Sequence, residues 1–218
     1  MGGLLMTLPH WLPLPLTAIT EYRDINFLVD YYYKYYTSDL VDSEIFFNSL
    51  PLVNKSRTFN CQDKFIIEGK NCNNNLFSCE NCAYNQKHEL FCHIISKRDD
   101  AIISKLKPEY QNKGKSRVPG LLIKDRLEKV RWIKSIIEEQ NNGGTNEITY
   151  FDEISANGFE KIYYLWLKKY SFVVIIGENI FDPKQKNLLY LKTAFIIDEK
   201  ETICVYYRKL DKYKKRSR

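Results

Sequence analysis

The chain has 218 residues, of which 44% are hydrophobic and 28% charged, so it is composed like a folded protein of one large or two small domains. Its net charge of +6 is uneven: residues 112–218 carry 22 Lys and Arg against 14 Asp and Glu (+8), and residues 1–111 carry the other 11 against 13 (−2). A basic second half favours a polyanionic partner. Nucleic acid is the commonest one, and a membrane surface is its main competitor.

The first twenty residues are apolar, but they match neither a signal peptide nor a membrane span. No Lys or Arg precedes the apolar stretch, and Pro9, Pro13 and Pro15 interrupt it. Residues 21–38 then place apolar side chains at helical spacing, which predicts an amphipathic helix. We therefore expect a cytoplasmic protein whose first part, residues 1–53, is a helical region.

Residues 54–110 form a second, cysteine-rich region. Its C-x2-C pair lets one tight turn aim two thiolates at the same metal ion, and further cysteines flank the pair. The candidate ligands of a structural zinc site are Cys72, Cys79, Cys82 and Cys92. Cys61 or His93 could replace one of them, and a set of free or buried thiols is the alternative interpretation.

The sequence predicts a basic α+β domain over residues 111–218, with a polar linker or loop at 107–120 that extends across its start. Residues 121–139 place apolar side chains on one stripe and predict a single helix of about five turns. Strand patterns follow at 147–154, 161–168, 171–176 and 188–197. The apolar run 172–176 is expected inside the sheet. Residues 201–216 are expected to form a strand end or short helix followed by a basic tail, and Cys204 is interpreted as a core residue.

These elements predict an α+β fold in which one helix packs on a four-stranded, mainly antiparallel sheet, behind a helical, Cys-rich amino-terminal region. Two places in this fold carry polar side chains where packing favours apolar ones. Arg126, Arg131 and Lys134 lie on or beside the apolar stripe of the helix, and Lys192 and Thr193 interrupt the last strand. Such side chains either extend outward to solvent or line a polar cleft.

Several catalytic motifs are missing from the sequence. It contains no HExxH, Walker A loop, dinucleotide-binding glycine loop or GxSxG, and no histidine follows His93. The basic half therefore favours chemistry performed by Lys, Arg, Tyr and Thr.

Residues 117–215 resemble the phage-associated branch of the Barnase–EndoU–Colicin–RelE superfamily of RNases. The similar segments are DRLEKVRWIKSII (125–137), KIYYLWLKKYSFVVII (161–176), NLLYLKTAFIID (187–198) and YYRKLDKYKK (206–215). The lack of a histidine departs from the His-dependent members of this superfamily.

The resemblance implies a metal-independent endoribonuclease that cleaves tRNA or mRNA by 2′-OH transesterification, without a catalytic cofactor. Such domains act as toxins in phage conflict or toxin–antitoxin systems, with an antitoxin or immunity protein as partner. The implied catalytic residues are Arg126, Arg131, Lys134, Lys192, Thr193 and Arg208. The implied RNA-binding residues are Lys124, Trp166, Tyr207, Lys209 and Lys212.

Two other functions fit the same residues: a non-catalytic nucleic-acid-binding module, and an interaction subunit of a phage-defence system. The arrangement of Arg131, Lys134 and Thr193 distinguishes them. Convergence of the three on one cleft favours an enzyme, and scatter over different faces favours a binding or structural role.

Overall fold

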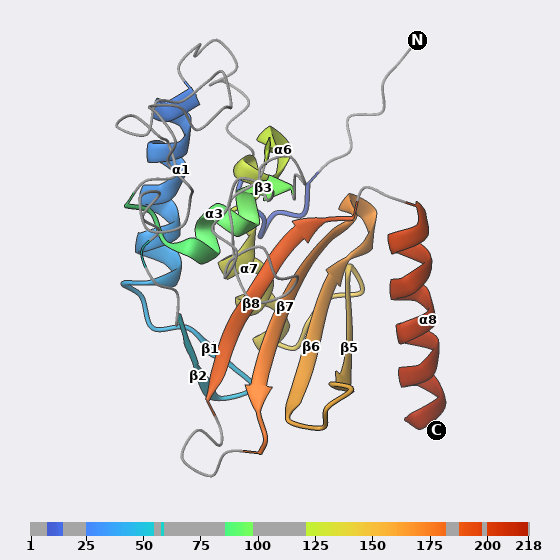
Figure 1. Ribbon diagram of the computed structural model, residues 1–218. Coiled ribbons are helices and arrows are strands. Elements are labelled where there is room, and N and C mark those ends of the chain that lie inside the picture. The colour runs from blue at the N-terminus through green and yellow to red at the C-terminus, as the bar shows by residue number, and fades with distance from the viewer. Residues whose placement is uncertain are drawn as a thin grey trace, which may run out of the picture.

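The protein has the α+β fold that its sequence predicts (Figure 1). The computed structural model describes residues 8–14, 25–54, 58, 86–97, 121–181, 188–197 and 200–217. Six strands form one sheet in the order β1-β2-β8-β7-β6-β5, and helices pack against both of its faces. The sheet is therefore the middle layer of the described fold.

Four antiparallel strands make up most of the sheet, at the positions that the sequence predicts. They are β5 (Ile148–Ile154), β6 (Glu160–Leu167), β7 (Phe172–Asn179) and β8 (Leu189–Ile196). The interior strand β7 pairs with both β6 and β8. Its run from Phe172 to Ile176 is buried throughout, which confirms the prediction made from its apolar composition.

The predicted count of four strands is wrong, because a hairpin from the amino-terminal region joins the sheet. Strands β1 (Phe46–Phe47) and β2 (Leu50–Val53) are antiparallel, and β2 then pairs in parallel with β8. Asn48 and Ser49 at the tip have φ angles of 51° and 63°, as a two-residue hairpin turn requires. The sheet is thus mixed rather than purely antiparallel.

The predicted single helix over residues 121–139 is also wrong. Leu121–Leu122 form strand β4, which pairs with β3 (Ser96–Lys97), and the rest divides into α6 (Lys124–Glu128) and α7 (Trp132–Asn141). In the intervening turn, Val130 N–H donates to Leu127 O and Ile133 N–H to Val130 O, the i to i+3 pattern of a tighter helix. A helix with three residues per turn places the side chains of Leu127, Val130 and Ile133 on the same side.

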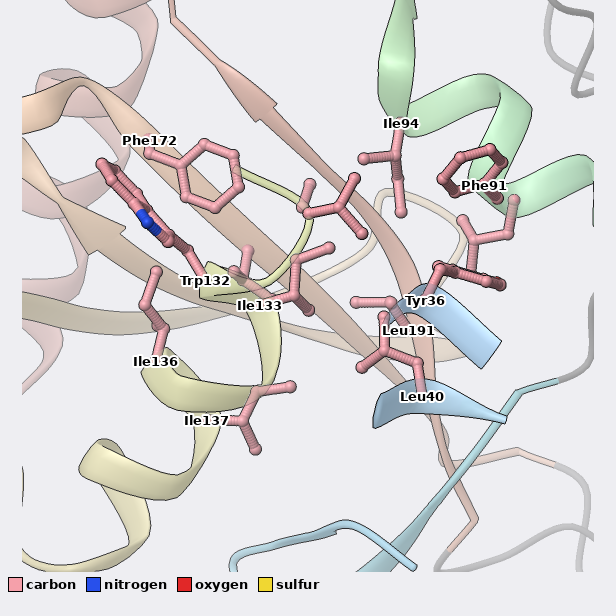
Figure 2. Close-up of a cluster of buried hydrophobic side chains, with 14 of the residues drawn as sticks. Tyr36, Leu40, Phe91, Ile94, Trp132, Ile133, Ile136, Ile137, Phe172 and Leu191 are labelled. Carbon is pink, nitrogen blue, oxygen red and sulfur yellow. The ribbon is translucent and has the colours of Figure 1, made fainter. Parts of the chain in front are cut away.

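The helices on this side of the sheet share one buried core (Figure 2). They are α1 (Ile25–Leu40), α3 (Glu89–Ile95) and α7, and α1 confirms the helix predicted over 21–38 for its described part. The labelled side chains converge from the three helices and two strands: Tyr36, Leu40, Phe91, Ile94, Trp132, Ile133, Ile136, Ile137, Phe172 and Leu191. The first and last members of this buried cluster along the sequence are Leu12 and Ala194. The cluster therefore includes residues of all three predicted regions, 1–53, 54–110 and 111–218.

The prediction for the carboxy-terminal segment is wrong as well. Residues Lys200–Arg216 form the 17-residue helix α8, which lies against the other face of the sheet. Its inner side carries Ile203, Tyr206, Leu210 and Tyr213, at the spacing of an amphipathic helix. Cys204 is exposed, not in the core, because it follows Ile203 and points away from that side. None of the described helices is both long and apolar enough to cross a membrane.

The hairpin can be tested by a matched pair of substitutions in β1. Phe47 is fully buried and packs on Tyr163 with ring centroids 5.3 Å apart, whereas its neighbour Phe46 is 47% exposed. Phe47→Ala should lower the free energy of unfolding in urea by about 3–5 kcal/mol, because it leaves a cavity. Phe46→Ala should change it by less than about 0.5 kcal/mol. Equal effects of the two substitutions would contradict this docking of the hairpin.

Candidate functional site

Polar side chains from two strands meet above Gly177, near the end of β7. A Cβ atom placed on Gly177 would lie 2.7 Å from Glu160 Oε1 on β6 and 2.7 Å from Tyr190 Cζ on β8. It would lie 2.9 Å from the Tyr190 hydroxyl oxygen. A glycine inside a strand often marks a close approach of this kind. Because Gly177 has no side chain, the carboxylate of Glu160 and the phenol of Tyr190 have room to meet above it.

Lys192 reaches the same place through an irregularity in β8. Ile175 lies opposite Thr193 and Ile176 lies opposite Leu191, so Lys192 is the additional residue of a β-bulge. Its ammonium forms an ion pair with Glu160 Oε2 across the intervening strand. We call Glu160, Tyr190 and Lys192 above Gly177 the Gly177 cluster.

The Gly177 cluster lies on the face of the sheet that also carries α8. Gly177 alternates with Ile175, which is buried in the α8-side core, so both residues project to that side. The side chains of Lys192 and Glu160 remain 31% and 16% exposed. A carboxylate, an ammonium and a phenol are thus held together within reach of solvent, and together they can accept a proton, donate one and bind an anion.

A second polar group on the same face fastens α8 to the sheet. Lys209 Nζ on α8 lies 2.5 Å from Glu153 Oε1 on β5 and 2.7 Å from the hydroxyl oxygen of Tyr164 on β6. The Tyr164 hydroxyl donates to the same Glu153 oxygen at 2.6 Å. Each member of this triangle has its partners within it, which is what a structural anchor requires.

Burial and hydrogen bonding set the protonation states in the triangle. Burial acts to raise the pKa of Glu153, but the hydrogen bonds from Lys209 and Tyr164 and the nearby cations outweigh it, so the pKa is lowered. Burial, and then the bond to Glu153, raise the pKa of the Tyr164 phenol far above its usual range. Glu153 is therefore charged and Tyr164 protonated at neutral pH.

The structure does not bring Arg131, Lys134 and Thr193 into one cleft. The Arg131 guanidinium lies 4.4 Å from the ring centroid of Tyr35 on α1, and Lys134 lies 4.0 Å from Glu138 along α7. Helix α7 packs on one face of the sheet. Thr193 lies opposite Ile175, which is buried on the other face.

The remaining predicted catalytic residues occupy three different places. Arg126 Nη1 donates to Ser96 O at 2.7 Å, and its guanidinium lies 5.8 Å from the ring centroid of Phe195 on β8. Arg208 is exposed on α8. Lys192, beside Thr193, is the predicted catalytic residue that belongs to the Gly177 cluster.

The predicted RNA-binding residues divide between α8 and other elements. Tyr207 and Lys212 are exposed on α8, whereas Lys209 is occupied in the anchor triangle. Trp166 is buried on β6 beneath α8, and its Nε1 has no hydrogen-bond partner among the described residues. Lys124 lies on α6, where it pairs weakly with Glu128, and Figure 1 places that helix away from α8.

The candidate zinc site falls mostly outside the described residues. Cys72, Cys79 and Cys82 are not among them, so the site stays a prediction. Cys92 is buried on α3, and the neighbouring His93 is exposed. No group of three potential metal ligands occurs within the parts of the chain that the structure describes.

Sequence reasoning missed Glu160, Tyr190 and Gly177, and it also missed Glu153 and Tyr164. The one signal available in the sequence was Gly177, which ends the apolar run before Glu178. Glycine inside a strand marks a close approach of other groups or a bulge. The partners above it come from other strands, and their meeting depends on the strand register. No family model, curated protein or solved structure was found to match the chain.

The anchor triangle predicts a pH-dependent effect of Glu153→Gln. A charge-assisted hydrogen bond contributes about 1.5–3 kcal/mol, so the variant should be less stable by that amount at neutral pH. The pKa of Glu153 is lower in the folded protein than its value of 4.5 in the unfolded chain. The stabilisation is therefore present at pH values above 4.5 and is lost as the pH falls through the pKa of the folded state. Urea unfolding should therefore show the difference at pH ~7 and a much smaller one at pH ~3.

Glu138→Gln is the matched control, because Glu138 is 54% exposed and forms only a distant pair with Lys134. It should change the free energy of unfolding by less than about 0.5 kcal/mol at either pH. A loss in Glu153→Gln that is the same at both pH values would contradict the role of the charged triangle.

Proposed function

We propose that the protein is a metal-independent endoribonuclease that cleaves RNA at the Gly177 cluster. The observation that supports this proposal is the convergence of Glu160, Tyr190 and Lys192 over a glycine. The three groups come from two strands that are not neighbours, and the ion pair of Glu160 and Lys192 spans the strand between them. A packing role alone does not require three proton-transferring groups to meet on one partly exposed spot.

The proposed reaction is an intramolecular transesterification. The 2′-oxygen of a ribose forms a bond to the adjacent phosphorus, and the bond from phosphorus to the 5′-oxygen of the next nucleotide breaks. Glu160 accepts the proton of the 2′-OH, and the Tyr190 phenol donates a proton to the departing 5′-oxygen. The products are a 2′,3′-cyclic phosphate and a 5′-OH end.

Lys192 has the electrostatic role in this scheme. Its ammonium stabilises the negative charge that develops on the phosphate oxygens, and its pairing with Glu160 holds both groups in position before the substrate binds. Thr193, next to Lys192 in the bulge, is proposed to donate a hydrogen bond to the same phosphate. The +8 charge of residues 112–218 favours the approach of the polyanionic substrate.

The biological setting of this proposal rests on the resemblance to the Barnase–EndoU–Colicin–RelE RNases. It places the activity in a toxin or phage-conflict effector that acts on tRNA or mRNA, restrained by an antitoxin or immunity protein. Growth arrest on expression of the parent, but not of Glu160→Gln, is the outcome expected for such an effector.

The cluster can be tested with end-labelled RNA and matched variants. Glu160→Gln should lower the cleavage rate about 10²–10⁴-fold, as expected for a lost general base. Lys192→Ala should lower it about 10²–10³-fold, as expected for a lost charge stabiliser. Cleavage by the parent should persist in a metal chelator and should leave cyclic phosphate ends.

The neighbouring pair of Lys161 and Asp152 provides the control. Lys161 follows Glu160 on β6 and so projects to the opposite face, where it lies 3.6 Å from Asp152. Its side chain is 33% exposed, close to the 31% of Lys192. Lys161→Ala and Asp152→Asn should leave the rate within a few fold. If the parent binds RNA but leaves it uncut, the enzyme proposal fails and a nucleic-acid-binding module takes its place.

A further inference from the structure

The outer side of α8 carries a row of solvent-exposed cations. Arg208, Lys212 and Lys215 are exposed and follow one another at intervals of four and three residues, so they lie on one side of the helix. Asp211 is the only acidic residue in the sequence from 204 to 217. This side of α8 therefore presents positive charge to solvent.

An exposed aromatic ring lies beside this row, at the end of the sheet where β6 enters the short helix η2 (Lys168–Tyr170). Tyr207 on α8 is 47% exposed, and its ring centroid lies 5.0 Å from that of the buried Trp166. Lys168 Nζ lies 5.2 Å from the centroid of Trp166 and 5.4 Å from that of Tyr207. We call Trp166, Lys168 and Tyr207 the Tyr207 corner.

The charges at this corner are not balanced. Burial lowers the pKa of Lys168, and repulsion by Lys214 on α8 lowers it further, against a smaller opposing effect of Asp211. An anion bound near Lys168 and Lys214 would relieve this repulsion. The corner thus combines a stacking surface with a place for a phosphate.

We propose that the outer side of α8 and the Tyr207 corner form a binding track for single-stranded nucleic acid. Tyr207 stacks on an unpaired base, while Lys168, Lys214 and the row of Arg208, Lys212 and Lys215 contact phosphates. Base stacking on an aromatic ring combined with cations along the backbone is the usual mode of single-strand binding. From Tyr207 to Lys215 the helix rises about 12 Å, which is enough for several phosphates.

A single strand fits these features better than a duplex, because the bases of a duplex are paired and stacked on one another and offer no free face to Tyr207. An acidic protein would satisfy the cations but would leave the aromatic ring without a role. The track is separate from the Gly177 cluster, so binding to it does not depend on the proposed cleavage.

The full-length protein should be titrated against a fluorescent 20-nucleotide oligo-dT, which lacks the 2′-OH and so is not cut by transesterification. Arg208→Ala/Lys212→Ala should weaken binding and reduce the slope of log affinity against log salt by about 1.4, or 0.7 for each lost phosphate contact. Lys34→Ala/Lys129→Ala removes the same charge from α1 and from the turn between α6 and α7, on the other side of the sheet, and should leave the slope nearly unchanged.

The stacking contact is tested separately. Tyr207→Ala should weaken binding on the order of tenfold, and Tyr207→Phe, which keeps the ring, should retain most of the affinity. A 20-base-pair DNA duplex and inorganic polyphosphate should each bind more weakly than oligo-dT at the same salt concentration.

Four results would overturn the track: unchanged affinity in Tyr207→Ala, equal binding of the duplex, equal binding of polyphosphate, or an equal loss in the control variant. Because the probe is not cleavable, a failure here leaves the proposed nuclease untouched. Loss of cleavage in Glu160→Gln with unchanged oligo-dT binding would likewise separate the cluster from the track.

Discussion

The fold depends on the need to cover both faces of β7. The five residues from Phe172 to Ile176 are buried, and they alternate between the two sides of the sheet. Each side therefore needs its own apolar partner, and the chain supplies α7 with α1 and α3 on one side and α8 on the other. Without α8, residues such as Val173 and Ile175 would be exposed to water. Covering β7 thus requires helices on both sides of the sheet.

Covering the second face with a single helix leaves polar groups on it that must be paired. Helix α8 reaches across the sheet to Glu153 through Lys209, and Tyr164 completes that arrangement. At the end of β7, Glu160 and Lys192 pair with each other instead, beside Tyr190. The two polar groups differ in one respect that matters for the proposed function. The first joins a helix to the sheet, whereas every member of the second comes from the sheet itself, so a ligand can displace contacts there without loosening α8.

Helix α8 also connects the two proposals. Its inner side holds the sheet and its outer side carries cations, so one amphipathic helix both completes the core and creates a basic surface. The Gly177 cluster and the Tyr207 corner both lie on the side of the sheet that faces α8, near opposite ends of β6. A single-stranded nucleic acid held along α8 would thus lie on the same side of the protein as the proposed reaction centre. A nuclease needs this arrangement, because the bound strand must reach the groups that cleave it.

The sequence by itself determined the α+β class, the four long strands and the burial of residues 172–176, because periodicity and apolar runs report which side of an element meets the core. It also singled out Lys192 as a polar residue in an apolar strand. It could not reveal the hairpin at 46–53, whose strands are too short for a periodic pattern, or the turn between α6 and α7, where tighter hydrogen bonding replaces the helix that spacing predicted. The meeting of Glu160, Tyr190 and Lys192 above Gly177 was decided only by tertiary structure. It depends on the pairing register of three strands and on a one-residue bulge, and no local pattern specifies which residues of distant segments become neighbours across a sheet.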